Sequence, residues 1–206
     1  MQNFIRPDRA LIDAFRDAPT AVVSDNLDRL PGLLGLRPFH RRGHLLGVAR
    51  TVRTRAGDNQ FIHKMLDLVE PGDVVVVAGE GDVSRALVGE IMKAIAEKRG
   101  VAGFVIDGAI RDSAAFAASD FPCFARGVTH RGPYKDGPGA LDVPVAIGGT
   151  VVSPGDIVVG DEDGVVSFPV AIAADLANAV RKQLAKEAEI MRAIADGTYT
   201  GAYAKK

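Results

Sequence analysis

Apolar runs and helix-like repeats take turns along this chain. The run Val74–Ala78 is apolar throughout, which is typical of a strand buried on both faces, and Leu45–Thr54 alternates as a strand does. Between them, apolar residues recur at helical spacing over residues 59–69, and Asp58 stands where it can cap that helix. This alternation of strand and helix patterns predicts an α/β fold.

The most informative stretch lies in the middle of the chain. Helical spacing over Gly89–Arg99 precedes a strand-like run, Ala102–Ile106, and a polar loop, Asp107–Asp112. The helix could begin at Ser84 or at Gly89. If it begins near Gly89, its N-terminus and the C-terminal end of the strand can meet on one side of the sheet, where open α/β folds bind ligands.

Three kinds of group then come together. A helix start offers free N–H groups and a partial positive charge, which suit a carboxylate. Arg111 offers a planar fork for a carboxylate or enolate oxygen, and Asp112 offers hard oxygens for Mg²⁺ or Mn²⁺. These groups suit a small oxo-acid bound with a divalent ion. Structural roles are open too: Asp112 could cap the next helix, Arg111 could pair with a surface acid, and Glu90 could complement the helix dipole.

Other polar motifs favour structural roles. His40 and His44 have a metal-like spacing, but Pro38 and Gly43 argue against a helix there, so a zinc site is not expected. The acidic stretch Asp161–Gly164 is interpreted as a hairpin turn rather than a metal site.

Four further features of the sequence give only weak evidence of function. Gly79–Ser84 is a weak match to a dinucleotide or S-adenosylmethionine loop, because Ser84 replaces the third glycine. Pro71-Gly-Asp73 and Pro154-Gly-Asp156 are read as one turn used twice. Thr129–Gly139 is read as a loop that could line a cleft or a subunit contact, or could be an ordinary exposed loop. His63 is expected at the surface or in packing.

Composition narrows the class of protein. The 206 residues are 47% hydrophobic and 25% charged with a net charge of −1, so bulk charge gives no reason to expect nucleic acid. The single Cys123 suits a reducing cytoplasm, and a buried, inert thiol is favoured over a nucleophile. Residues 1–8 contain no apolar signal core, and no run approaches a membrane-spanning length.

The pair Gly89-Glu90, followed after twenty residues by Arg111-Asp112, resembles the signature of the RraA-like family. That family includes regulator of ribonuclease activity A and the class II 4-hydroxy-4-methyl-2-oxoglutarate aldolases, which also decarboxylate oxaloacetate. The stretch Pro154–Pro169 is similar to a second family motif. The resemblance runs from about Thr20 to the C-terminal helix.

The resemblance implies a role for each matching residue. Arg111 corresponds to the substrate arginine, and Asp112 to the ligand of Mg²⁺ or Mn²⁺. Glu90 corresponds to an acid, usually Asp in the aldolases, that positions a water or moves a proton. The backbone amides implied to hold the pyruvate part of the substrate are those of Gly89, Glu90, Ile91 and Met92. Ala115 departs from the family, since many members carry an acid there.

The resemblance also implies the larger organisation. We expect one three-layer, swivelling-domain-like unit over residues 1–206, with a central mixed sheet flanked by helices. The N-terminal helices and the C-terminal helix are expected to pack on the core or on a neighbouring subunit of a homotrimer or hexamer. The implied activity is metal-dependent carbon–carbon cleavage in pyruvate-containing oxo-acids. The alternatives are a non-catalytic regulator that binds a ribonuclease or another protein, and a methyltransferase.

Overall fold

The computed structural model describes residues 4–29 and 32–201. The helices are α1 (Arg9–Asp13), α2 (Thr20–Asp25), α3 (Gln60–Leu66), α4 (Glu90–Lys98), α5 (Ser113–Ala117) and α6 (Val170–Ala195). The strands are β1 (Arg37–Pro38), β2 (Leu45–Thr54), β3 (Asp73–Ala78), β4 (Ala86–Val88), β5 (Gly103–Ile110), β6 (Cys123–Val128), β7 (Gly139–Leu141), β8 (Val145–Ile147), β9 (Thr150–Val152), β10 (Ile157–Asp161) and β11 (Gly164–Phe168).

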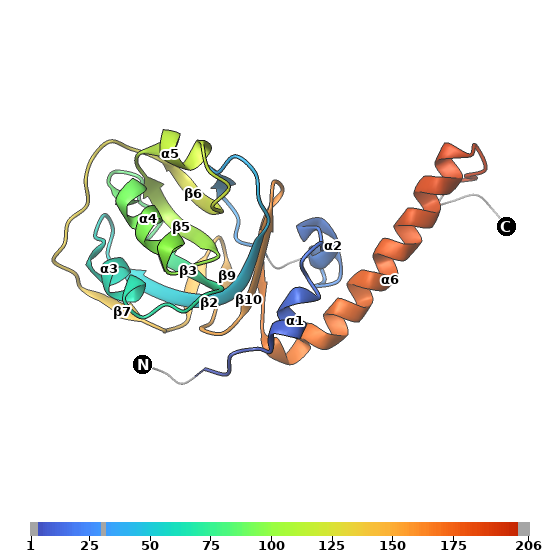
Figure 1. Ribbon diagram of the computed structural model, residues 1–206, viewed down its shortest axis with the longest axis horizontal. Helices are drawn as coiled ribbons and strands as arrows, with labels where there is room; N and C mark the ends of the chain where they lie inside the picture. The colour runs from blue at the N-terminus through green and yellow to red at the C-terminus, as the bar shows by residue number, and fades with distance from the viewer. Residues whose placement is uncertain (1–3, 30–31, 202–206) are drawn as a thin grey trace.

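A large mixed sheet organises the chain, in the strand order β1-β6-β5-β3-β2-β10-β11. Strands β2, β3, β5 and β6 are parallel to one another, whereas β10 runs antiparallel to both of its neighbours, β2 and β11. Helices α3, α4 and α5 lie over one face, and α1, α2 and α6 lie beyond the β10 end (Figure 1). The predicted α/β class, with a mixed sheet flanked by helices, is confirmed.

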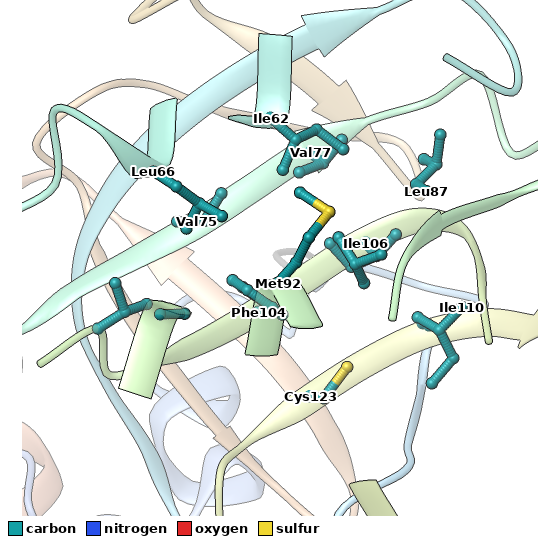
Figure 2. Packing of buried hydrophobic residues seen from close by; sticks show 14 of the residues in the cluster. Ile62, Leu66, Val75, Val77, Leu87, Met92, Phe104, Ile106, Ile110 and Cys123 are labelled. Carbon is teal, nitrogen blue, oxygen red and sulfur yellow. The ribbon is translucent and has the colours of Figure 1, made fainter. Parts of the chain in front are cut away.

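Three apolar clusters hold these layers together. The first lies between the sheet and α3–α5, where Met92 and Phe104 pack among aliphatic side chains (Figure 2). The second joins β10 and β11 to α1, α2 and α6. On the opposite face of the sheet, the antiparallel hairpin β8–β9 contributes Val145, Ile147 and Val152 to the third cluster. The sheet is therefore covered on both faces, as its apolar strands require.

The segment 107–110 corrects one prediction. It was expected in a polar loop, but β5 continues through it to Ile110, and β4 pairs beside it. Asp107 is buried within this strand because Arg126 donates to its Oδ1 and the Gly81 amide donates to its Oδ2 at 3.1 Å. A buried carboxylate is tolerated when charge and hydrogen bonds compensate it.

The two Pro-Gly-Asp segments adopt the same turn, as predicted. Gly72 and Gly155 have φ angles of 88° and 91°, the left-handed values that favour glycine. In each turn the Asp side chain accepts a hydrogen bond from the residue before the proline. The Glu70 amide lies 2.7 Å from Asp73 Oδ2, and the Ser153 amide lies 2.8 Å from Asp156 Oδ2.

Helix α6 extends far beyond the sheet (Figure 1). Its buried residues, Ala173, Leu176, Ala177 and Val180, all lie in its first half. Further along, Met191 and Ile194 are 65% and 50% exposed. Within the described residues, no helix is long and apolar enough to cross a membrane.

Candidate functional site

The start of α4 lies directly beside the end of β5. Gly89 is the N-cap of α4 in an extended conformation, and it has no side chain to cap the helix. The Arg111 amide donates to the Val88 carbonyl at 3.0 Å, which fixes the two segments together. The first amides of a helix have no partner within the helix. The helix therefore begins at the position that an anion site requires, and not at Ser84.

Asp112 turns its carboxylate toward this helix start. Its backbone is left-handed, with φ 53° and ψ 39°, and its side chain does not cap α5. Instead, the Glu90 amide donates to Asp112 Oδ2 at 3.0 Å. Arg111 Nε lies 3.7 Å from the same oxygen. The simple interpretation of Asp112 as a side-chain cap for the following helix is therefore wrong.

Gly89 permits this close approach. A Cβ atom added there would lie 2.5 Å from Asp112 Oδ2, 3.0 Å from Arg111 Cγ and 3.2 Å from Arg111 Nε. The φ angle of Gly89 is −149°, which any residue can adopt, so the glycine is needed for space rather than for its backbone.

A cavity of about 150 Å³ lies at this junction. Arg111 and Asp112 form one wall with the start of α4, where Gly89, Ile91 and Met92 contribute. The remaining lining residues are Asn59 and His63 from α3 and its N-cap, Ala86, Leu87 and Val88 from β4, and Pro133 and Lys135 from the loop after β6. Glu90 is not among them; its amide faces Asp112, and its exposed side chain lies outside the cavity wall.

A larger cavity, of about 720 Å³, lies between α1 and the N-terminal ends of the parallel strands. Its cationic side chains already have partners: Arg6 lies 2.6 Å from Asp73, and Arg16 contacts Asp13. The predicted site residues are absent from its lining. We therefore place the candidate site in the smaller cavity, which Arg111, Asp112 and the start of α4 line.

Asp58 anchors the loop that walls the cavity. Its side chain is fully buried and accepts hydrogen bonds from the amides of Gln60, Asp136 and Gly137 at 2.9, 2.8 and 2.8 Å. Burial alone would raise the pKa of Asp58, but these donors and Arg55 hold it below its ordinary value. The sequence predicted Asp58 as the cap of α3; the N-cap is Asn59, and Asp58 accepts the amide of Gln60, the first helical residue, from one position earlier. The clamp on the loop was not predicted.

His63, expected at the surface or in packing, is half-buried and lines the cavity. Burial, and then the positive charge of Lys135, lower the pKa of His63. The imidazole is therefore favoured in its neutral form. The signal available in the sequence was its position one helical turn after Asn59, which places both residues on one face of α3.

Asp112 has room for an additional ligand. Its side chain is 43% exposed, and its Oδ1 accepts no hydrogen bond from residues 4–29 or 32–201. Over the same residues, no three His, Cys, Asp or Glu side chains gather as a metal cluster. Mg²⁺ commonly keeps several waters and uses one or two carboxylates, so a single open carboxylate fits such an ion. The side chain of Ala115 supplies no oxygen ligand for a metal ion.

The remaining sequence candidates have structural roles. Cys123 is fully buried, and burial raises the pKa of its thiol, as expected for an inert residue. Asp161 closes the β10–β11 hairpin and accepts the Thr20 amide at the start of α2 at 2.7 Å. His40 contacts the Cys123 backbone rather than His44. The loop Gly79–Ser84 leads into strand β4, so it lacks the helix that a dinucleotide loop requires.

Known proteins share this fold and sequence pattern. The sequence model of the family described as "RraA-like: Aldolase/RraA" matches residues 20–167. A Halalkalibacterium halodurans protein named "Putative 4-hydroxy-4-methyl-2-oxoglutarate aldolase" is 40% identical over 186 residues, which are 90% of this chain and 89% of that protein.

Two solved structures extend the similarity to almost the full chain. An uncharacterized protein from Pseudomonas syringae pv. tomato has a TM-score of 0.86 and 29% identity, covering 95% of this chain and 97% of its own. Streptomyces coelicolor RraAS2, described as an unusual member of the RNase ES inhibitor RraA protein family, has a TM-score of 0.83 and 30% identity, with 92% and 99% covered. This chain belongs to the RraA-like family.

Proposed function

We propose that this protein is a divalent-metal-dependent lyase that cleaves a carbon–carbon bond in oxo-acids containing a pyruvate unit. The candidate substrates are 4-hydroxy-4-methyl-2-oxoglutarate, which the name of the relative supports, and oxaloacetate. The observation that carries the proposal is the meeting of the α4 start with Arg111 and Asp112 in one cavity, where the Glu90 amide donates to Asp112 Oδ2 at 3.0 Å.

Two groups bind the pyruvate unit in this account. The amides of Ile91 and Met92 lie at the positive end of the α4 dipole and donate hydrogen bonds to the substrate carboxylate. Arg111 reaches the adjacent keto oxygen with its planar guanidinium group. Gly89 keeps the carboxylate of Asp112 and the stem of Arg111 close to these amides.

Asp112 is the proposed ligand of Mg²⁺ or Mn²⁺, with waters completing the coordination. When bound, such an ion supplies Lewis-acid polarisation of the keto group. The bond between C3 and C4 breaks, and its electron pair passes to the enolate oxygen of the pyruvate unit. Arg111 stabilises that negative charge.

Proton transfers complete the reaction. In the aldol substrate, the C4 hydroxyl loses its proton and becomes the carbonyl of a second pyruvate; in oxaloacetate, C4 leaves as carbon dioxide. C3 of the enolate then gains a proton to form pyruvate. Glu90 is proposed to position the water that transfers a proton, acting from the first turn of α4 outside the cavity wall.

A regulator is the second candidate function, supported by the similarity to Streptomyces coelicolor RraAS2. In that case an RNase partner is retained on the immobilised protein, and retention is unchanged by Asp112→Ala.

We further propose a homotrimer or hexamer in which the exposed outer half of α6 packs on a neighbouring subunit. Analytical ultracentrifugation of the chain with and without residues 183–201 tests this assembly.

Pyruvate release tests the lyase proposal. It is measured from both substrates with Mg²⁺, with Mn²⁺ and with EDTA, after subtraction of metal-catalysed background. Arg111→Ala and Asp112→Ala are expected to abolish turnover. Arg41→Ala and Asp120→Ala are matched controls, because they remove an exposed Arg–Asp pair 3.0 Å apart that lies outside the cavity lining. Equal, background-level rates in all proteins refute the proposal for these substrates.

A further inference from the structure

One buried oxygen in the cavity wall has no partner. Asn59 is 4% exposed, and its Oδ1 accepts no hydrogen bond from the described residues. Only one other buried side-chain polar atom within those residues is unpaired, Ser167 Oγ in β11, and it does not line the cavity. A buried acceptor without a donor is destabilising, so its retention beside a candidate site needs a reason.

The orientation of the Asn59 amide is fixed by its own nitrogen. Nδ2 donates to the Leu87 carbonyl at 3.0 Å and contacts Met92 Sδ at 3.4 Å. If the amide were turned over, Oδ1 would face the Leu87 carbonyl, and two acceptors would oppose each other. The Asn59 backbone amide also donates to the Tyr134 carbonyl at 3.1 Å, which holds the residue in place. Oδ1 is therefore a pre-positioned acceptor.

An acceptor selects for a donor. A carboxylate and a keto group carry no proton to donate, so neither the pyruvate unit nor oxaloacetate in its ionised keto form can satisfy Oδ1. The aldol substrate differs in one relevant group, the hydroxyl on C4, next to the bond that breaks. A hydroxyl that donates to Oδ1 would remove the unpaired state that the free protein carries.

We infer that Asn59 is a specificity-determining residue whose side-chain carbonyl accepts a hydrogen bond from the hydroxyl of a 4-hydroxy-2-oxo acid. This inference rests on the proposed lyase function and adds a residue that discriminates between its two candidate substrates. Asn59 contacts the hydroxyl from the start of α3, in the cavity that Arg111 and Asp112 also line. A site built in this way favours hydroxy-oxo acids over analogues without the hydroxyl.

The test compares two substrates on one protein. The quantity measured is the ratio of kcat/KM for 4-hydroxy-4-methyl-2-oxoglutarate to kcat/KM for oxaloacetate. In Asn59→Ala this ratio is expected to fall about tenfold, the effect of losing one hydrogen bond in a buried site. Asn59→Ser, with a smaller polar side chain, gives the same direction and serves if the alanine variant folds poorly.

Thr54→Val is the matched control. It removes a buried hydrogen bond of 2.9 Å from Thr54 Oγ1 to the Asp58 carbonyl, one residue from Asn59 and outside the cavity lining. The ratio is expected to stay at the native value in this variant. A ratio that is also unchanged in both Asn59 variants, with the two rates falling together, overturns the inference and leaves the lyase proposal standing. Native protein without activity on either substrate removes both.

Discussion

Replacement of Gly89 by alanine tests the geometry of the site. The added Cβ would lie 2.5 Å from Asp112 Oδ2 and 3.0 Å from Arg111 Cγ. Relaxed carbon contacts need about 3.5 Å, so the carboxylate must retreat by about 1 Å and the Arg111 stem by about half of that. Both obstructing groups are side chains, and the Gly89 backbone is extended, so the fold can accept the change.

A misplacement of this size is expected to lower kcat/KM about 100-fold, which is about 2.7 kcal/mol of transition-state stabilisation. The assay is pyruvate release from oxaloacetate at saturating Mg²⁺, with Tm measured on the same samples. Tm is expected to change by less than about 4 °C, corresponding to about 1 kcal/mol. Gly32→Ala is the control, because a Cβ there meets only the Val165 carbonyl at 4.0 Å. A folded Gly89→Ala protein with native kcat/KM refutes the reasoning.

Three other predictions concern stability and reactivity. Asp58→Asn replaces a carboxylate that accepts three amide hydrogen bonds, so unfolding should become about 2 kcal/mol easier and Tm about 4–8 °C lower. Because the pKa of Asp58 is lowered, the stability that its carboxylate contributes is present above the ordinary carboxyl pKa and is lost as pH falls through the lower native value. The Tm values of the native protein and Asp58→Asn should therefore converge in acid. A difference in Tm that stays constant with pH contradicts this. Burial raises the pKa of Asp156 despite the hydrogen bond from the Ser153 amide, so the free energy of unfolding should fall as pH rises from the ordinary carboxyl pKa through the raised one. Urea titrations from about pH 3 to 7 should show this fall in the native protein and not in Asp156→Asn. An unchanged pH slope in the variant contradicts the prediction. Cys123 should resist a thiol reagent in native buffer and react fully in urea, because its thiol is buried and its pKa raised; rapid native labelling would place it at an accessible surface.

Local patterns predicted the features that depend on neighbouring residues in the chain. The apolar run Val74–Ala78 is the central strand β3, and helical spacing identified α4 but left its start open between Ser84 and Gly89. The Pro-Gly-Asp turns were readable because each uses a proline, a glycine with positive φ and an Asp side chain within four residues. Periodicity and turn chemistry act over such short distances, so the sequence is sufficient to predict them.

Contacts across long sequence separations were not predictable in the same way. Strand β4 has three residues and is a strand because it pairs with β5 at Ala109 and Ile110, while Asp107 pairs with Ala78 of β3. The Asp58 clamp depends on amides 78 and 79 residues further along the chain. Asn59 lines the cavity, and its side-chain amide donates to the Leu87 carbonyl, 28 residues away. None of these partners leaves a periodic signal, so the site's α3 wall emerged only from the folded chain.

Proton exchange at the methyl group of pyruvate tests the central claim most directly, because it detects enolate formation at the site without a cleavable substrate. The measurement follows the pyruvate methyl signal by proton NMR in D₂O, with Mg²⁺ or with EDTA. We predict metal-dependent exchange by the native protein that is abolished in Arg111→Ala and Asp112→Asn and retained in Arg41→Ala. Exchange at the background rate in the native protein, or equal exchange in all four, would contradict the assignment of this cavity as the site of carbon–carbon cleavage.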